Sequence, residues 1–332
     1  MLTKKVAVAV SAAILGLSQV AMVSGAEGAD AGAHDAAKTG GFQFSMDAGV
    51  EAWGGDITYQ IGFPVTDAYG YTYNGYFPFS ELSFPLDATF GVVEAEAVIL
   101  NKYVIGLTLK KNVTDPDDYM EDRDWITDSD PQRLDVYSDS EVTDFSAFIV
   151  DVDLSYRVFV NDRISLAAGF GYMYQDFEYD TAVRRQWSPS GYMGFDYIGD
   201  GTTSLIYEVD FEMPYLLFEG QFNIIPALKL NGRIAYAPWV DVDNTDQHLL
   251  RSKVNTGNLS GYAFMTSIEA EYDFTPQFFM MGGLDYTFVD VDGDMDASFY
   301  GIYDHTVAEE LESNQTSLFA KIGFRFGVPA GM

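Results

Sequence analysis

Two carboxylates separated by a single residue, Asp122 and Asp124, are the first side chains in this sequence that could carry out chemistry. Side chains of an extended chain alternate between faces with a period of two, so both carboxylates fall on the same side. Held close together they repel, which favours one protonated and one ionised carboxyl near neutral pH. Such a pair can hold and polarise a water molecule. The alternative is a solvated acidic loop, in a chain that has 50 Asp and Glu residues.

The same spacing joins Asp246 to His248, one of three histidines in the sequence. A carboxylate that accepts the proton of one ring nitrogen fixes the tautomer of the imidazole and supports it as a base. An Asp-x-His pair alone is weak support for catalysis. Facing the Asp122–Asp124 pair across a water molecule, however, it would form an apparatus able to hydrolyse an amide.

The elements that must position these pairs are strands, because the dominant period from Phe42 onward is two. Apolar and polar residues alternate along Phe148–Val158, Ile164–Tyr174, Leu228–Tyr236, Tyr262–Tyr272 and Leu318–Phe326. Repeated this often, the pattern is typical of strands with lipid outside and a polar lumen inside. A soluble β-sandwich would show the same alternation, usually with shorter strands and fewer aromatic residues than the 15% found here.

Ten such segments begin near residues 42, 79, 102, 141, 163, 203, 226, 257, 277 and 312. Short turns near 101, 160–163, 223–226 and 275–277 alternate with long polar loops near 63–78, 117–140, 181–202, 241–256 and 295–311. This rhythm predicts an all-β fold over residues 42–327, a ten-stranded antiparallel transmembrane β-barrel with long extracellular loops and short periplasmic turns. Both candidate pairs would then lie in long loops at the outer rim.

The N-terminal segment predicts export. Lys4 and Lys5 precede an apolar run that ends in Ser24-Gly25-Ala26, which is typical of a secretory signal peptide over residues 1–26. A retained membrane anchor is the alternative, disfavoured because polar residues interrupt the run. Residues 27–41, rich in Ala, Gly and Asp, are expected to be a flexible leader.

Charge and composition exclude several classes of function. Without Lys4 and Lys5, 16 of the 18 Lys and Arg residues remain against 50 acids, a formal charge of −34. Such a surface repels nucleic acid and attracts cations and cationic peptides. The absence of Cys excludes disulfide and thiolate chemistry.

At this point the chain resembles a known family, the omptins, which are ten-stranded outer-membrane endopeptidases of aspartyl/histidine type. The resemblance extends from about Ser45 to Phe326 and is carried by Met120-Glu121-Asp122-Arg123-Asp124-Trp125, Ser129-Asp130-Pro131, Glu212-Met213-Pro214-Tyr215, Trp239-Val240, Asn244-Thr245-Asp246-Gln247-His248 and Phe274-Thr275-Pro276. It implies that Asp122 and Asp124 help to hold the nucleophilic water, that His248 removes its proton, and that Asp246 orients His248. It implies neither an acyl-enzyme nor a metal.

The resemblance also suggests substrate-binding residues, with two departures from the family. The acids that select basic side chains in omptins match Asp56 on the first strand and Asn244, which contributes no charge, with Asp243 beside it. Asp135 lies near the acid of the next subsite. The alternative is that Asp56 and Asp243 are ordinary acids of the rim.

Lipid contact is the second departure. Omptins depend on lipopolysaccharide held by outward basic residues, whereas the matching positions of the predicted lipid-facing rim, near Tyr172, are Asp176 and Asp210. Carboxylates repel lipid phosphates unless divalent cations bridge them. We therefore expect no bound cofactor and leave two contacts open, lipopolysaccharide as an activator and a divalent cation as a bridge.

These features together predict an outer-membrane endopeptidase of a Gram-negative-type bacterium, with an extracellular active site and with cationic peptides or proteins as substrates. The main alternative is a catalytically silent barrel of the same type, acting as an adhesin or structural protein. A passive pore is a further alternative, although a narrow lumen filled by inward charges should conduct negligibly. The acidic run Asp290–Asp296 would suit a calcium loop less well than a solvated hairpin tip, because its Gly is misplaced for an EF-hand.

Overall fold

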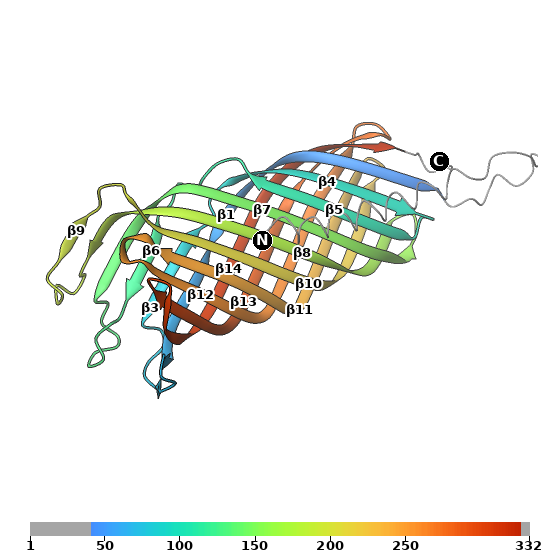
Figure 1. Ribbon diagram of the computed structural model, residues 1–332. Helices are drawn as coiled ribbons and strands as arrows, with labels where there is room; N and C mark the ends of the chain where they lie inside the picture. The colour runs from blue at the N-terminus through green and yellow to red at the C-terminus, as the bar shows by residue number, and fades with distance from the viewer. Residues whose placement is uncertain (1–40, 327–332) are drawn as a thin grey trace, which may run out of the picture.

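The computed structural model describes residues 41–326, and these form one antiparallel sheet that closes on itself (Figure 1). Its strands are β1 (Phe42–Asp67), β2 (Thr72–Tyr73), β3 (Ser80–Pro85), β4 (Thr89–Ile99), β5 (Tyr103–Asn112), β6 (Met120–Asp124), β7 (Val136–Val160), β8 (Ile164–Trp187), β9 (Asp196–Ile198), β10 (Thr203–Ile225), β11 (Leu228–His248), β12 (Lys253–Asp273), β13 (Phe278–Phe299) and β14 (Ile302–Phe326). The predicted signal peptide, nearly all of the leader and residue 327 lie outside the described residues.

Consecutive long strands pair in sequence, and the pairing of β1 with β14 closes the ring. The all-β antiparallel barrel predicted from the period of two is thus confirmed. The strands number fourteen rather than the expected ten, because the sheet contains the short strands β2, β3, β6 and β9, of two to six residues. In Figure 1 the labelled short strands β3, β6 and β9 gather at the left end of the barrel.

Two of the expected long loops are instead tight hairpins. β11 and β12 are joined by the single 3-10 turn Leu249–Arg251 and Ser252, and β13 and β14 by Tyr300 and Gly301 alone. The polar residues of 241–248 and 302–311 belong to strands that continue beyond the apolar belt. Most of their acids, such as Asp241, Asp243 and Glu310, are on the outward face, whereas Asp246 and Glu309 are buried inside. A bilayer is crossed by roughly 9–11 strand residues. Because β11 and β12 each have 21 residues, about half of each strand rises above the membrane.

Side chains alternate between the two faces of the wall as expected. Around the half of the barrel near the short turns, the outward side chains are large, apolar and exposed, and include Phe170, Leu216, Phe218, Ile234, Tyr236, Phe264, Ile268, Leu284, Leu318 and Ile322. Exposure of so much apolar surface to water would be unfavourable, whereas contact with lipid is favourable. No helix long and apolar enough to cross a membrane occurs in residues 41–326.

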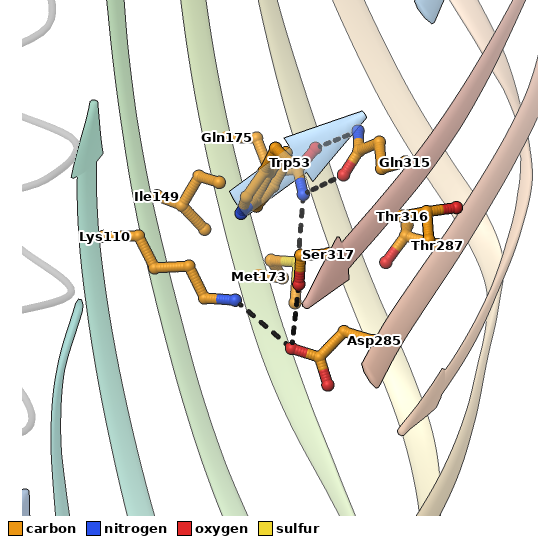
Figure 2. A pocket seen from close by; sticks show the side chains of 10 residues that line it. All are labelled: Trp53, Lys110, Ile149, Met173, Gln175, Asp285, Thr287, Gln315, Thr316 and Ser317. Carbon is orange, nitrogen blue, oxygen red and sulfur yellow. Dashed lines mark hydrogen bonds and ion pairs between the residues drawn. The ribbon is translucent and has the colours of Figure 1, made fainter. Parts of the chain in front are cut away.

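The interior of the belt region is filled by charged and amide side chains that pair with one another. Lys110 lies 2.9 Å from the Glu51 carboxylate and 3.6 Å from that of Asp285, and Lys321 lies 2.7 Å from Glu94. Figure 2 shows Lys110 and Asp285 pointing toward one another beside the paired amides of Gln175 and Gln315, which line a cavity of about 30 Å³. The lumen is therefore plugged rather than open.

Above this layer lies a second, apolar plug. Tyr59, Phe84, Tyr179 and Tyr207 are almost completely buried, and the rings of Phe84 and Tyr207 stack at 4.2 Å between centroids. Further apolar residues from β3, β7, β10, β11 and β13 pack against them. This apolar layer forms a floor between the charged lumen and the end of the barrel that carries the short strands.

Candidate active site

The first candidate pair lies on β6, a short strand held between β3 and β7, and not in a loop as expected. Asp122 is paired in register with Leu82 of β3, and Asp124 with Ser80; Leu82 and Ser80 are buried inside the barrel. Residues opposite each other in register share a face, so both carboxylates point inward. The expectation that the spacing of two puts them on one face therefore holds.

Asp122 and Asp124 are both partly buried, and each has a serine as a neighbour. The Ser138 hydroxyl of β7 lies 3.4 Å from Oδ2 of Asp122, and Ser80 hydrogen bonds to Asp124. Oδ1 of Asp122 has no hydrogen-bond partner within residues 41–326. Burial, the charge of Asp124 and the charge of Asp246 raise the pKa of Asp122 well above its ordinary value. Burial also raises the pKa of Asp124. The pair therefore retains a proton at pH values where exposed carboxyls are ionised.

The second candidate pair lies at the end of β11. Asp246 is fully buried, and its Oδ2 lies 3.0 Å from Nε2 of His248. The same oxygen accepts hydrogen bonds from the Tyr59 hydroxyl at 2.7 Å and from Nδ2 of Asn255 at 3.2 Å. Burial by itself would raise the pKa of Asp246, but the hydrogen bonds from His248 and Tyr59 hold it below its usual range. Asp246 is thus an ionised acceptor within a protein interior.

These contacts fix the tautomer of His248. Nε2 faces the Asp246 carboxylate and must donate, while Nδ1 accepts a hydrogen bond from the Arg251 guanidinium at 2.7 Å. A guanidinium can only donate, so Nδ1 carries no proton. The basic nitrogen of His248 is therefore the one directed away from Asp246, which is the arrangement that a general base requires.

The two pairs face one another across the same end of the barrel. Tyr59, which donates to Asp246, is paired in register with Leu82 of β3, and Leu82 is paired with Asp122 of β6, so these side chains share the inner face. The nearby charge of Asp246 accordingly contributes, after burial and Asp124, to the raised pKa of Asp122. Below them the Tyr59–Phe84–Tyr207 floor closes the site from the lumen. Three carboxyls, one imidazole and the Arg251 guanidinium thus lie close together above the apolar floor.

The suggested substrate residues are placed less uniformly. Asn244 points inward from β11, two residues before Asp246, and its Nδ2 donates to Oε1 of Glu309 at 2.7 Å. Asp243 is exposed on the outward face and accepts from Asn258. Asp56, next to the buried Ile57, also lies on the outward face of β1. The structure therefore brings only Asn244 to the two pairs.

Asp135 is buried, but its carboxylate is already occupied. Nε of Arg133 donates to one oxygen at 2.7 Å, and the backbone amide of Ile126 donates to the other at 3.1 Å. These bonds fold the segment between β6 and β7 on itself, so a substrate side chain would have to compete with an ion pair already formed. In this structure Asp135 organises a loop.

The residues of the predicted lipid-facing rim share the outward face of β8 and β10. Tyr172 and Asp176 follow the exposed Phe170 at intervals of two, and Asp176 is paired in register with Asp210. Asp210 in turn is opposite Asp243 of β11. Carboxylates thus occupy three adjacent strands on the outer wall, and the hydroxyl of Tyr174 hydrogen bonds to Asp210.

No group of three or more His, Asp or Glu side chains within residues 41–326 is arranged to hold a metal ion. The acidic run Asp290–Asp296 is neither a calcium loop nor a hairpin tip, because it lies within β13. Its acids occupy the outward face, while Val291 and Met295 are buried inside. The period of two explains this run fully.

Several residues of the site were not found from the sequence. Tyr59, Asn255, Ser80, Ser138 and Glu309 lie on other strands than the two pairs, and they reach the site only through the register between strands. A Tyr at an inward parity of β1 could have been singled out only if the first strand had been aligned with β11 across the barrel interior. The spacing of residues within one segment carries no such information.

Comparisons with known proteins agree with this fold. The family model described as the Omptin family matches residues 94–326, which include Asp122, Asp124, Asp246 and His248 but not Tyr59. The crystal structure of the outer membrane protease OmpT from Escherichia coli matches with a TM-score of 0.68 and 16% identity, covering 86% of this chain and 97% of that chain. At this identity the likeness shows the fold alone.

More distant barrels also match. The outer membrane protein OprG from Pseudomonas aeruginosa gives a TM-score of 0.36 at 10% identity, covering 86% of this chain and 96% of that chain; the translocator domain of the autotransporter NalP from Neisseria meningitidis gives 0.37 at 10%, covering 96% and 98%. At these TM-scores, neither match supports a conclusion about this chain. No curated protein sequence matches the chain. Since the family model spans well over half of the sequence, the chain is an outer-membrane β-barrel that belongs to the Omptin family.

Proposed function

We propose that this protein is an endopeptidase that hydrolyses peptide bonds with a water molecule activated by His248. The observation that supports this most strongly is the Asp246–His248 contact of 3.0 Å with Nδ1 of the imidazole left unprotonated, facing the Asp122–Asp124 pair. A base with a fixed tautomer beside a proton-sharing carboxyl pair suits the activation of water.

The proton movements follow from the contacts. A water held between the carboxyl pair and Nδ1 of His248 attacks the carbonyl carbon and gives one proton to Nδ1. The carbonyl π pair moves to oxygen, and the tetrahedral intermediate carries that negative charge. Asp246, through Nε2, stabilises the imidazolium. When the intermediate collapses, the C–N bond breaks, the imidazolium proton passes to the leaving amine, and the products are a carboxylic acid and an amine.

We propose that the site opens to the cell exterior and takes basic peptides. The short turns and both ends of the described chain lie at the opposite end of the barrel, as expected when that end faces the periplasm. Acids such as Asp241, Asp243, Glu310 and Glu312 are exposed on the outer wall of the protruding part. Their field would concentrate cationic substrates.

The test is to incubate the refolded barrel with a mixed peptide library and to read the cleavage sites by mass spectrometry. We expect cuts in or near basic segments, and no cuts with Asp122→Asn. A silent barrel would leave the library intact. A pore would instead raise the conductance of a planar bilayer, which the paired lumen charges and the apolar floor should prevent.

We further propose that contact between Asp176, Asp210 and anionic lipid headgroups requires divalent cations, since adjacent carboxylates repel phosphate. The expected result is that lipopolysaccharide raises the activity of purified protein only when divalent cations are present. Full activity without lipopolysaccharide and in the presence of a chelator would refute this proposal.

A further inference from the structure

Arg251 lies at the tip of the β11–β12 hairpin, directly beside the catalytic imidazole. The 3-10 turn Leu249–Arg251 ends at Ser252, whose left-handed backbone (φ 49°) turns the chain back so that Lys253 is paired in register with His248. From this turn, Nη2 of Arg251 reaches Nδ1 of His248 at 2.7 Å. The guanidinium therefore occupies the space beside the nitrogen that must take the proton of the water.

Arg251 differs from the other arginines at this end of the barrel. The others are each in an ion pair with a carboxylate: Arg123 with Glu81, Arg133 with Asp135, Arg184 with Asp139 and Arg185 with Asp196. Arg251 forms no ion pair within the described part of the chain, although its charge lowers the pKa of both Asp122 and Asp124. It is a cation held in the site but not neutralised there.

The charge of the site explains why such a cation is needed. With one proton on the Asp122–Asp124 pair, an ionised Asp246 and a neutral His248, the four groups carry negative charge before the reaction begins. Amide hydrolysis then adds an oxyanion, which would be strongly disfavoured beside carboxylates in a partly desolvated site. Preorganised cationic donors are the usual means of stabilising such charge.

We propose that Arg251 is a further catalytic residue that stabilises the oxyanion of the tetrahedral intermediate, with Lys253 adding positive charge behind it. The inference rests on the proposed peptidase activity. When the nucleophilic water replaces the guanidinium as the hydrogen-bond donor to Nδ1, the guanidinium donates instead to the adjacent carbonyl oxygen of the substrate. The five N–H donors of Arg allow this change without loss of the charge. The carbonyl oxygen gains the π pair in the attack and returns it when the C–N bond breaks.

The test compares Arg251→Gln and Arg251→Lys with the wild type on a peptide that the wild type cleaves. We expect Arg251→Gln to lower kcat by about 10²- to 10³-fold, the range found for lost oxyanion donors, with KM little changed. Arg251→Lys should restore part of the loss. A phosphinic peptide, which mimics the anionic tetrahedral intermediate, should bind Arg251→Gln more weakly by a similar factor, while a non-cleavable ground-state peptide binds equally well.

Arg185→Gln is the matched control, because it removes one cation from the same end of the barrel but contacts Asp196 instead of His248. It should keep the wild-type kcat. If the wild type cleaves peptides and Arg251→Gln keeps its kcat, or gains activity because Arg251 merely blocks Nδ1, the inference is overturned while the peptidase remains. If the wild type cleaves no peptide, the peptidase proposal itself is overturned, and the inference with it.

Discussion

Replacing Tyr59 by Phe tests whether the buried contacts of Asp246 support catalysis. The substitution removes only the hydroxyl that donates to Oδ2 of Asp246 at 2.7 Å, and it leaves the ring in contact with Tyr207 and Phe84. Asp246 keeps two donors, His248 and Asn255. The perturbation is therefore confined to one hydrogen bond of one carboxylate.

The expected magnitude follows from the charge and burial of this acceptor. A hydrogen bond to a charged group is worth roughly 1.5–3 kcal/mol, which corresponds to about a 10- to 100-fold loss in kcat if the bond orients and stabilises the His248 imidazolium throughout the reaction. The Tyr59 hydrogen bond also lowers the pKa of Asp246. Because the pKa of folded Asp246 lies below its unfolded value, its ionisation stabilises the fold above about pH 4, and this stabilisation is lost as the pH falls through the folded pKa. Tyr59→Phe should move that loss to higher pH.

The assay is the pH dependence of kcat and KM for a cleaved peptide, together with urea unfolding at pH 3–7. Tyr179→Phe is the control, because Tyr179 packs in the same aromatic floor but donates to the backbone oxygen of Pro85. We expect the control to keep its kcat. Equal activities of Tyr59→Phe and the wild type, with the acid limb unmoved, would refute the role of the Asp246 contacts.

Three further predictions concern buried ionisable groups. Burial and Asp124 raise the pKa of Asp122, so ionisation of Asp122 lowers the stability of the fold as the pH rises above about 4. Asp122→Asn should therefore abolish cleavage, yet stabilise the fold against urea at pH 7 and not at pH 3. Glu309 is 1% exposed, and burial raises its pKa to about 8. The free energy of unfolding should therefore fall by up to roughly 1.4 kcal/mol per pH unit between about pH 4.5 and 8. Glu309→Gln should remove this pH dependence, and an unchanged dependence would show that another group titrates. Lys110→Met should destabilise the barrel by about 3–5 kcal/mol because it leaves the buried Glu51 unpaired, and Lys110→Met with Glu51→Gln should recover most of that loss, whereas a double variant no more stable than the single would contradict it.

The barrel could be predicted from the sequence because its signal is local and repeated. The period of two in segments such as Phe148–Val158 reports which face meets lipid, whatever the neighbouring strand is. The two pairs were also found locally, since Asp122 and Asp124, like Asp246 and His248, are two residues apart in an extended chain. Where the strands end was harder to predict. The segments that carry Asp241 and Asp243 and the run Asp290–Asp296 resembled loops, although these acids form the solvent-exposed outer face of strands that continue above the membrane.

Residues that support the site from other strands could not be predicted in the same way. Tyr59 reaches Asp246 across 187 positions of sequence, and Asn244 reaches Glu309 across 65. Such contacts depend on the stagger of the whole ring. Glu309 contacts Asn244 next to Gly257, where a Cβ atom would lie 2.2 Å from Oε2 of Glu309. The contact therefore requires a glycine at position 257. A one-residue shift also decides parity, which is why Asp56 matched a substrate acid in the sequence but faces outward on β1.

The central claim is that the carboxyl pair and the imidazole act on one water molecule as a unit. It is tested most directly by the cleavage rates of His248→Ala, Asp122→Asn and the double variant at saturating peptide. We expect each single variant to lose nearly all activity. The double variant should be about as active as the less active single variant, as found for groups that act together. Losses that multiply in the double variant, or a His248→Ala variant that still cleaves at the wild-type rate, would contradict the claim.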